Sequence, residues 1–232
     1  MEEDIFGGSD IVAGILAGGR SRRLGVDKAF IRWRGRYLLE HSIRGVSILT
    51  RDVFILAKDA QPYRHFGCPV LPDLTKDSTP LSGIVTVAPL VSEWLLLTAC
   101  DIAVIRRELF LELWMQRAPD RAAVLRSPEG LQPFAALYPA WLLHMWVEAF
   151  ERGRYRLQGT LEAMPKNVLS ITDLEKKYGQ SPLLVNVNSS DDIRLLGDLA
   201  DDLDAERFAD GYVGTVEERI SPLEAETRPA SR

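Results

Sequence analysis

The sequence predicts an α/β protein in which a mainly parallel sheet is covered by helices on both faces. Short apolar runs of strand length recur along the chain with little polar alternation, at residues 11–16, 53–57, 94–98, 122–125 and 183–187. Such runs are typical of strands that are buried on both sides. The segments between them show helical periodicity, and alternation of strands with helices favours a parallel sheet.

The predicted helices separate these predicted strands. In residues 141–152, apolar side chains recur at helical spacing with charged residues between them. Residues 81–90 and 106–117 show the same pattern, and Pro89 ends the first of these helices early. Ser189 followed by Asp192 resembles an N-cap with an acidic third position, which predicts a helix toward Leu199. Ligands of parallel sheets bind at the carboxyl ends of the strands, so a site is expected there.

The composition is that of a globular protein, and it argues against several classes of function. The chain has 232 residues, of which 46% are hydrophobic and 26% are charged, so one domain with a substantial core is expected. The net charge of −5 argues against a general nucleic-acid binder, although a local basic site for a small anion is compatible with it. Cys68 and Cys100 form no CxxC pair, and the three histidines do not cluster. A disulfide scaffold and a zinc cluster are therefore not expected.

The ends of the chain carry little chemistry. The start, "MEEDIFGGSD", is acidic and does not resemble a signal peptide, and no apolar run reaches the length of a membrane span. We therefore expect a cytoplasmic protein with no membrane partner. Residues 10–200 are predicted to form the domain, and the acidic, apolar-poor residues 201–232 are predicted to form a loosely held tail.

The segment "ILAGGRSRRLGVDKA", residues 15–29, leaves the first predicted strand and concentrates positive charge. Its spacing matches neither the GxxxxGK[ST] P-loop nor the GxGxxG dinucleotide fingerprint. Gly18 and Gly19 would let backbone N–H groups approach an anion. Residues 20–36 hold seven basic residues against one acid. The segment thus predicts an anion site, while a tight turn followed by solvated arginines is the alternative.

The same segment resembles the signature of the molybdenum cofactor guanylyltransferases, the MobA-like NTP transferases. Their pattern reads LAGG-x-S-x-R-M-G-x-D-K, and this chain departs from it only at Leu24, which replaces the methionine. Five later segments resemble the family in the same order: "RWRGRYLLEH", "LPDLTKDSTPLSGI", "LLLTACDIAVI", "LQPFAALYP" and "VNVNSSDDI". The resemblance implies a three-layer, Rossmann-like fold of the nucleotide-diphospho-sugar transferase (GT-A-like) kind.

The resemblance implies how the nucleotide is held. The backbone of Leu16, Ala17 and Gly18, with Gly19 beside it, would contact GTP, and Lys28 would contact its phosphates. A lysine is a compact charge that can neutralise negative charge developing on phosphate. A surface ion pair between Lys28 and its neighbour Asp27 is the alternative interpretation.

Two acids complete the implied site. Asp73 would contact the nucleotide, because a carboxylate accepts hydrogen bonds from ribose hydroxyls or from guanine N1 and N2; a turn or cap residue is the alternative. Asp101 would hold Mg²⁺, which prefers a few carboxylates together with phosphate oxygens. It follows "WLLLTAC", so it should stand at the carboxyl edge of the sheet. The alternative for Asp101 is an N-cap of the following helix.

Other implied contacts and departures concern the substrates. Phosphate or pterin contacts are implied for a further set of residues: Arg20, Arg22, Arg23, Asn186 and Asn188. The family has a nucleotide-contacting asparagine at the position that corresponds to Leu56 in this chain. It has a glycine at the position that corresponds to Thr79. It has Pro-Phe where this chain has Ala103 and Val104. These departures bear on nucleotide affinity and base choice more than on the reaction.

The implied reaction is transfer of GMP from GTP to the phosphate of molybdopterin-bound molybdenum cofactor, with release of pyrophosphate. Proteins that deliver the cofactor, and molybdoenzymes that accept it, are further implied partners. The alternatives are a cytidylyltransferase, in which the loop usually reads LAAG, another nucleotidyltransferase of the superfamily, and a non-catalytic nucleotide-binding homologue. Gly18-Gly19 favours GTP, Asp27-Lys28 argues against sugar-phosphate enzymes with Pro-Lys, and Asp101 together with Lys28 favours catalysis.

Overall fold

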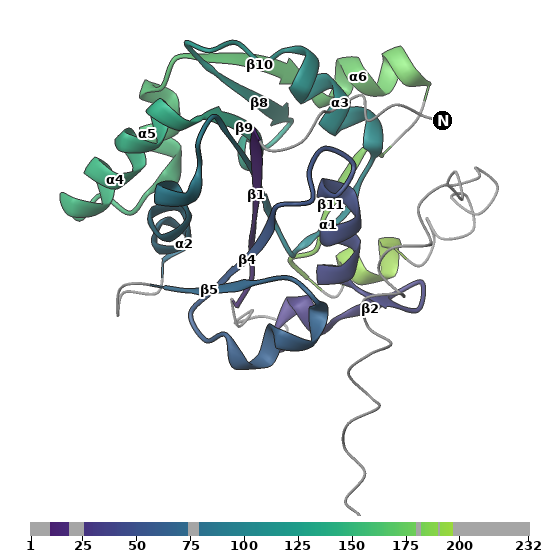
Figure 1. Cartoon of the computed structure of the whole chain (residues 1–232). Helices are drawn as coiled ribbons and strands as arrows, with labels where there is room; N and C mark the ends of the chain where they lie inside the picture. Colours follow the sequence, from purple (N-terminus) through teal and green to yellow (C-terminus); the bar gives the residue numbers. More distant parts are fainter. Residues whose placement is uncertain (1–9, 19–25, 74–78, 180–181, 190, 197–232) are drawn as a thin grey trace, which may run out of the picture.

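The structure, a computed structural model, describes residues 10–18, 26–73, 79–179, 182–189 and 191–196, and these form three layers (Figure 1). The middle layer is a sheet with the strand order β10-β8-β9-β6-β1-β4-β5. All its neighbouring strands are parallel except β9, which is antiparallel to β6 and β8. The strands are β1 (Ile11–Leu16), β4 (Val53–Ala57), β5 (Val70–Pro72), β6 (Trp94–Ala99), β8 (Ala122–Ser127), β9 (Gly130–Pro139) and β10 (Lys166–Ser170).

Helices cover both faces of this sheet, which confirms the predicted fold class (Figure 1). One face packs against α1 (Leu38–Val46), α3 (Arg107–Met115) and α6 (Ile171–Tyr178). The other packs against α2 (Pro80–Val87), α4 (Leu143–Glu151) and α5 (Leu157–Ala163). Side chains of a strand point alternately to the two faces, so Ala13 and Ile15 join the first core while Val12 joins the second.

The helix α2 packs closely on β1 and β4 because Gly83 has no side chain. A Cβ at Gly83 would lie 2.7 Å from Leu16 Cδ2 and 3.1 Å from Leu56 Cβ. Leu56 is 1% exposed and belongs to the second core. A side chain at position 56 therefore faces the core and not the edge of the sheet. The assignment of Leu56 to the position of the nucleotide-contacting asparagine of the family is for this reason not supported. The exposed residue that follows β4 at the edge of the sheet is Lys58.

Two small antiparallel sheets lie beside the main sheet. The strands β7 (Ile102–Ile105) and β11 (Leu184–Asn186) pair with each other, and β2 (Arg32–Trp33) forms a hairpin with β3 (Arg36–Tyr37). A third core joins them, in which Trp33 packs with Ala103 and Leu196. The indole N–H of Trp33 donates to the Leu196 carbonyl at 2.9 Å. The last described residues are thereby attached to a hairpin near the start of the chain.

Some element boundaries differ from the predicted ones for local reasons. The predicted helix 81–90 ends its α-helical part at Val87 and continues as the 3₁₀ helix η3 (Ala88–Leu90), because Pro89 lacks the N–H that an α-helix needs. The predicted helix 141–152 begins with the 3₁₀ helix η4 (Ala140–Leu142) before α4. The helix predicted from Ser189 is described for residues 191–196, and the tail predicted for 201–232 lies outside the described residues.

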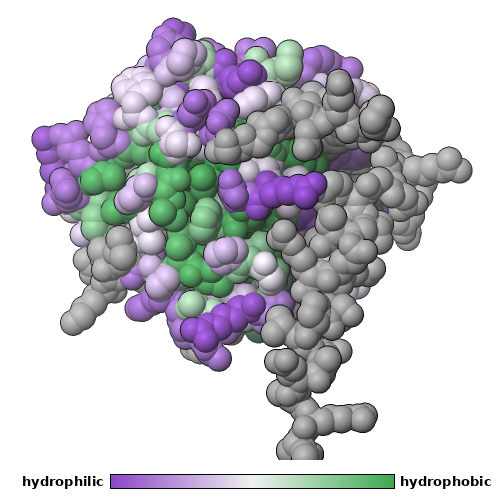
Figure 2. Space-filling model, in the orientation of Figure 1, coloured by the Kyte–Doolittle hydropathy of each residue, from purple (hydrophilic) through white to green (hydrophobic). Residues whose placement is uncertain are grey.

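The surface in the orientation of Figure 1 has a hydrophobic area near its centre, with hydrophilic residues above it, to its left and below it (Figure 2). Partly buried apolar side chains extend the second core outward, among them Leu16, Phe54 and Leu71. No helix in the described part of the chain has the length and apolar character that a membrane crossing requires.

Candidate active site

The carboxyl ends of β1, β4 and β6 lie side by side at one edge of the sheet. Leu16 is in register with Leu56 on β4 and with Ala99 on β6. Backbone bonding continues past the strand ends: the Cys100 N–H donates to the Leu16 carbonyl at 2.9 Å, and the Ala17 N–H donates to the Leu56 carbonyl at 2.8 Å. The segments that follow these strands therefore leave the sheet close together, at the edge where parallel sheets bind ligands.

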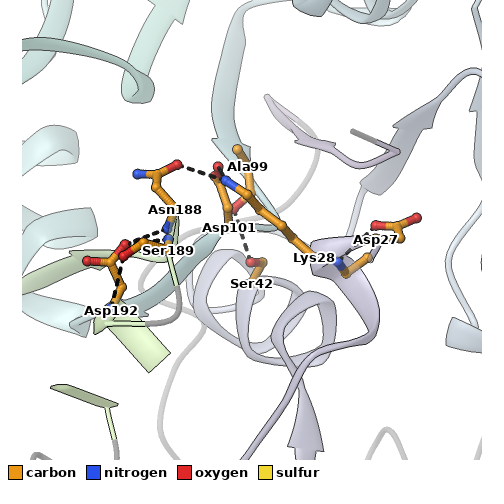
Figure 3. A network of polar contacts seen from close by, with 9 residues as sticks. Asp27, Lys28, Ser42, Ala99, Asp101, Asn188, Ser189 and Asp192 are labelled. Atoms are coloured by element: carbon orange, nitrogen blue, oxygen red, sulfur yellow. Dashed lines mark hydrogen bonds and ion pairs between the residues drawn. The ribbon is translucent and has the colours of Figure 1, made fainter. Parts of the chain in front are cut away.

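Lys28 lies at this edge and bonds two oxygen atoms from distant parts of the chain. Its Nζ donates to Asp101 Oδ2 at 2.9 Å and to Asn188 Oδ1 at 2.8 Å (Figure 3). The side chain of Lys28 is 14% exposed and that of Asp101 is 31% exposed. The structure thus brings together three of the residues that the sequence singled out.

Asp27 is engaged elsewhere, so the alternative pairing of Lys28 with Asp27 is wrong. Asp27 caps the 3₁₀ helix η1 (Lys28–Phe30), where its Oδ1 accepts the N–H of Ala29 at 3.0 Å. Its other oxygen accepts the hydroxyl of Tyr63. Burial, together with the charge of Asp27, raises the pKa of Tyr63. Tyr63 also packs against Gly18, which has a φ of +91° and where a Cβ would lie 3.3 Å from the Tyr63 oxygen.

Asp101 is positioned by backbone contacts on both sides and does not cap a helix. Its carbonyl accepts the N–H of Val187 at 2.7 Å, which ties it to the segment after β11. The buried Ser42 hydroxyl on α1 donates to the Ala99 carbonyl, two residues before Asp101, at 3.3 Å. The N-cap of α3 is Arg106, and β7 lies between Asp101 and that helix. The alternative interpretation of Asp101 as an N-cap is therefore wrong.

The two asparagines have different surroundings. Asn188 Oδ1 accepts from Lys28, whereas Asn186 Oδ1 is buried with no hydrogen-bond partner in the described part of the chain. Both lie near Asp101, because β11 pairs with β7 directly after that residue. The pterin contact expected of them remains a prediction, and Asn188 gains a defined contact with the predicted catalytic lysine.

Asp73 lies at the same edge, beyond the end of β5. Its N–H donates to the Ala57 carbonyl at 3.1 Å, and burial raises the pKa of its carboxyl group while the charge of Lys58 opposes that rise. The cap of α2 is Thr79, so Asp73 is not a helix cap. The Thr79 N–H donates to Ser82 Oγ at 3.3 Å, which gives this residue a structural role in starting α2.

The remaining predicted residues bear on the site in different ways. Gly19, Arg20, Arg22 and Arg23 lie outside the described residues. Ala103, two residues after Asp101 in the sequence, packs in the third core. Within the described ranges, no group of three or more histidine, cysteine, aspartate or glutamate side chains is arranged to hold a metal.

Sequence reasoning missed two residues that support the site. Tyr63 had no local signal, because its bond to Asp27 joins positions 36 residues apart. Asp192 had one, the cap spacing with Ser189, but its link to the site depends on tertiary contacts. Asp192 Oδ2 accepts the N–H groups of Asn188 and Ser189 at 2.7 and 2.8 Å.

Comparisons with known proteins show to which family this chain is similar. A family model described as the MobA-like NTP transferase domain matches residues 13–168. A molybdenum cofactor guanylyltransferase from Syntrophotalea carbinolica is 27% identical over 77% of this chain and 86% of its own. A protein from Nostoc sp. called a probable molybdenum cofactor guanylyltransferase is 30% identical over 84% of this chain and 94% of its own.

Solved structures show the same fold. Molybdopterin-guanine dinucleotide biosynthesis protein A from Archaeoglobus fulgidus aligns with a TM-score of 0.70 at 18% identity, over 82% of this chain and 98% of that one. The 2-C-methyl-D-erythritol 4-phosphate cytidylyltransferase of Thermus thermophilus aligns with a TM-score of 0.62 at 18% identity, over 83% of this chain and all of that one. At these identities the structures show the fold alone. The family match over residues 13–168, with the relatives that align along most of their length, shows that this chain belongs to the MobA-like NTP transferase family.

Proposed function

We propose that this chain is a molybdenum cofactor guanylyltransferase, which transfers GMP from GTP to the terminal phosphate of the molybdopterin-bound cofactor and releases pyrophosphate. Family membership and the names of the relatives support nucleotidyl transfer. The observation that carries the proposal is the meeting of Lys28 with Asp101 at the carboxyl edge of the sheet, 2.9 Å apart. The fixed positive charge of Lys28, together with the carboxylate of Asp101, which can bind a second cation, suits a reaction between two polyanions.

The reaction needs positioning and charge neutralisation more than covalent help from the protein. An oxygen of the acceptor phosphate forms a bond to the α-phosphorus of GTP, and the bond from that phosphorus to the oxygen bridging to the β-phosphate breaks. The electron pair of the broken bond leaves with pyrophosphate. Because Lys28 is 14% exposed, its charge is less screened than that of a surface lysine, and we assign it to the phosphates.

Asp101 fits a hard divalent cation, and we propose that it holds Mg²⁺. Its Oδ2 already lies 2.9 Å from an ammonium group, so this oxygen stabilises positive charge. One protein carboxylate suffices for Mg²⁺, which usually keeps several waters and binds substrate phosphates. When bound, the ion would neutralise charge on the reacting phosphates. Asp101 would hold it while Lys28 retains its bond to Asn188.

The choice of GTP rests on relatives and on the loop sequence. The fold does not decide it, because a cytidylyltransferase is among the structural neighbours. The Gly18-Gly19 pair and the guanylyltransferase relatives favour GTP. Asp73 lies at the same edge of the sheet and its carboxylate can accept hydrogen bonds, and we assign it to the base or the ribose. The protein is expected to act in the cytoplasm, where it would receive the cofactor from one protein and pass it to a molybdoenzyme.

The test supplies purified protein with Mg²⁺, molybdenum cofactor and either GTP or CTP, and measures pyrophosphate release and the dinucleotide product. GTP-dependent release that requires the cofactor is expected. Turnover with CTP alone would transfer the chain to the cytidylyltransferases. Nucleotide binding without turnover would identify a non-catalytic homologue. Asp101→Ala is expected to abolish this release. Asp120→Ala is its matched control, because this exposed aspartate precedes β8 and so lies at the opposite edge of the sheet.

A further inference from the structure

The carboxylate of Asp192 organises the segment that carries Asn188. Its Oδ2 accepts the backbone N–H of Asn188 at 2.7 Å and that of Ser189 at 2.8 Å. In return, Ser189 Oγ accepts the N–H of Asp192 at 3.2 Å. These reciprocal bonds are those of a capping box at the start of the helix over residues 191–196. They fix the backbone on which the Asn188 side chain stands (Figure 3).

This cap differs from an ordinary one because the residue it fixes holds the predicted catalytic lysine. Asn188 Oδ1 accepts from Lys28 Nζ at 2.8 Å, and the same Nζ donates to Asp101 at 2.9 Å. The neighbouring Val187 N–H donates to the Asp101 carbonyl at 2.7 Å. The segment 187–189 therefore contacts both the acid and the lysine, and Asp192 sets its backbone.

The electrostatics of Asp192 agree with this arrangement. Burial opposes ionisation of its carboxyl group, but the N–H donors of Asn188 and Ser189 and the Ser189 hydroxyl outweigh burial. The charge of Lys28 acts in the same direction, so the pKa of Asp192 lies below its ordinary value. Asp192 is therefore negatively charged at neutral pH, and its charge attracts the ammonium group of Lys28 toward the observed position beside Asn188.

We propose that Asp192 is a positioning residue for the proposed nucleotidyl transfer: it fixes Asn188, and Asn188 holds Lys28 at the point where nucleotide phosphate binds. This assignment rests on the proposed function. Lys28 donates to both Asp101 and Asn188. It therefore keeps its hydrogen bond to Asn188 when Asp101 binds another cation. Asp192 itself touches neither substrate nor the reacting atoms.

A double-mutant cycle between Asp192 and Lys28 tests the proposal. It is measured twice on the full chain, as kcat/KM for GMP transfer and as affinity for a GTP analogue with a methylene bridge between the α- and β-phosphates. Asp192→Asn alone is expected to lower kcat/KM about tenfold, because it weakens two hydrogen bonds to a charged acceptor. In the Lys28→Met background it is expected to change kcat/KM less than about twofold, because the group that it positions is gone.

Two further variants separate positioning from general effects on the helix. Asp191→Asn removes a charge from the same helix, and its side chain is 83% exposed and paired with exposed Arg194, so wild-type kinetics are expected. Asp192→Glu is expected to restore most of the activity, because glutamate at this position also closes a capping box. Equal losses for Asp191→Asn and Asp192→Asn would overturn the assignment.

The cycle also distinguishes the failure of this assignment from that of the proposed function. If the losses of the two single variants multiply in the double variant, in both measurements, Asp192 acts independently of Lys28, and the positioning role is overturned. Coupling in analogue binding without any GMP transfer by the wild-type chain would support the positioning role and reject the guanylyltransferase.

Discussion

Lys28 is the residue on which the candidate site depends, because its ammonium joins an acid after β6 to an amide near the last described residues. At 14% exposure it has lost part of its hydration, which the two oxygen acceptors replace. The position of its charge is therefore set by the fold rather than by side-chain mobility. The ammonium group of Lys28 and a divalent cation would compete for the same carboxylate oxygen of Asp101, so this contact is expected to weaken metal binding.

Lys28→Met is expected to lower GMP transfer about a hundredfold or more, by removing charge stabilisation of the phosphates. In the nucleotide-free protein, however, it is expected to tighten Mn²⁺ binding about threefold to tenfold, because the competing ammonium is gone from Asp101. Electron paramagnetic resonance titration measures the bound Mn²⁺. Mn²⁺ affinity that is unchanged or weaker in Lys28→Met would contradict cation competition at Asp101.

Gly18, which follows β1 at the edge of the sheet, has a backbone conformation that disfavours a side chain. Its φ of +91° is unfavourable for any residue with a Cβ, and that Cβ would lie 3.3 Å from the Tyr63 oxygen. Gly18→Ala is therefore expected to lower the free energy of unfolding by about 1–2 kcal/mol in urea denaturation. Gly159→Ala is the control: this glycine lies in α5 with open space around it, so a gain of about 0.5–1 kcal/mol is expected. Equal effects of the two variants would refute the strain argument.

At the scale of elements, α3 and α6 are joined by a partly buried carboxylate. Glu112 on α3, whose side chain is 11% exposed, accepts from Lys177 and from the Tyr178 hydroxyl at 2.5 Å. Both hydrogen bonds lower the pKa of Glu112 and outweigh the opposing effect of burial. The hydrogen bond from Lys177 is the larger cause of this shift, and because Lys177 is 58% exposed, solvent screens part of its attraction for Glu112.

This pKa shift gives stability a defined pH dependence. Because the pKa of folded Glu112 lies below the ordinary value of 4.5, its contribution is fully present above pH 4.5 and is lost as pH falls through the folded value. Glu112→Gln is expected to cost about 1–3 kcal/mol at pH 7 and less at pH 3. Urea denaturation at both pH values measures the difference. A cost that stays equal at pH 3 would argue against the charge as its source.

The elements also show what local sequence could and could not predict. The strands β1, β4 and β6 follow from their apolar runs, because strands buried on both faces need no polar alternation. The pairing of β7 with β11 did not follow, since its paired residues lie 79 to 84 positions apart in the sequence and the register shifts between Val185 and Asn186. The antiparallel direction of β9 likewise depends on its position between β6 and β8.

At the scale of the whole molecule, the sheet collects the site from segments spread over most of the sequence. Lys28 and Asn188 are 160 positions apart, and Lys28 and Asp101 are 73 positions apart. The loop motif and the acid after a central strand were recognisable in the sequence, because each is a local pattern. That Asn188 bonds the lysine was not, because this contact exists only once β11 has paired with β7.

The third core predicts where the chain can be shortened. Leu196 is 1% exposed and its carbonyl accepts from Trp33, so the helix over 191–196 is part of the domain. A chain cut after residue 200 is expected to keep its melting temperature and GMP transfer. A chain cut after Ser189 loses Asp192 and Leu196, and is expected to lose several degrees and most of its activity. Equal behaviour of the two truncations would show that the last helix is dispensable.

The central claim is that Asp101, held 2.9 Å from Lys28, takes part directly in nucleotidyl transfer. The measurement that tests it most directly is kcat/KM for GTP-dependent pyrophosphate release by Asp101→Asn, which removes the charge and keeps the shape. We predict a loss of at least about a thousandfold, with an unchanged circular dichroism spectrum. Activity within about threefold of wild type would contradict the claim.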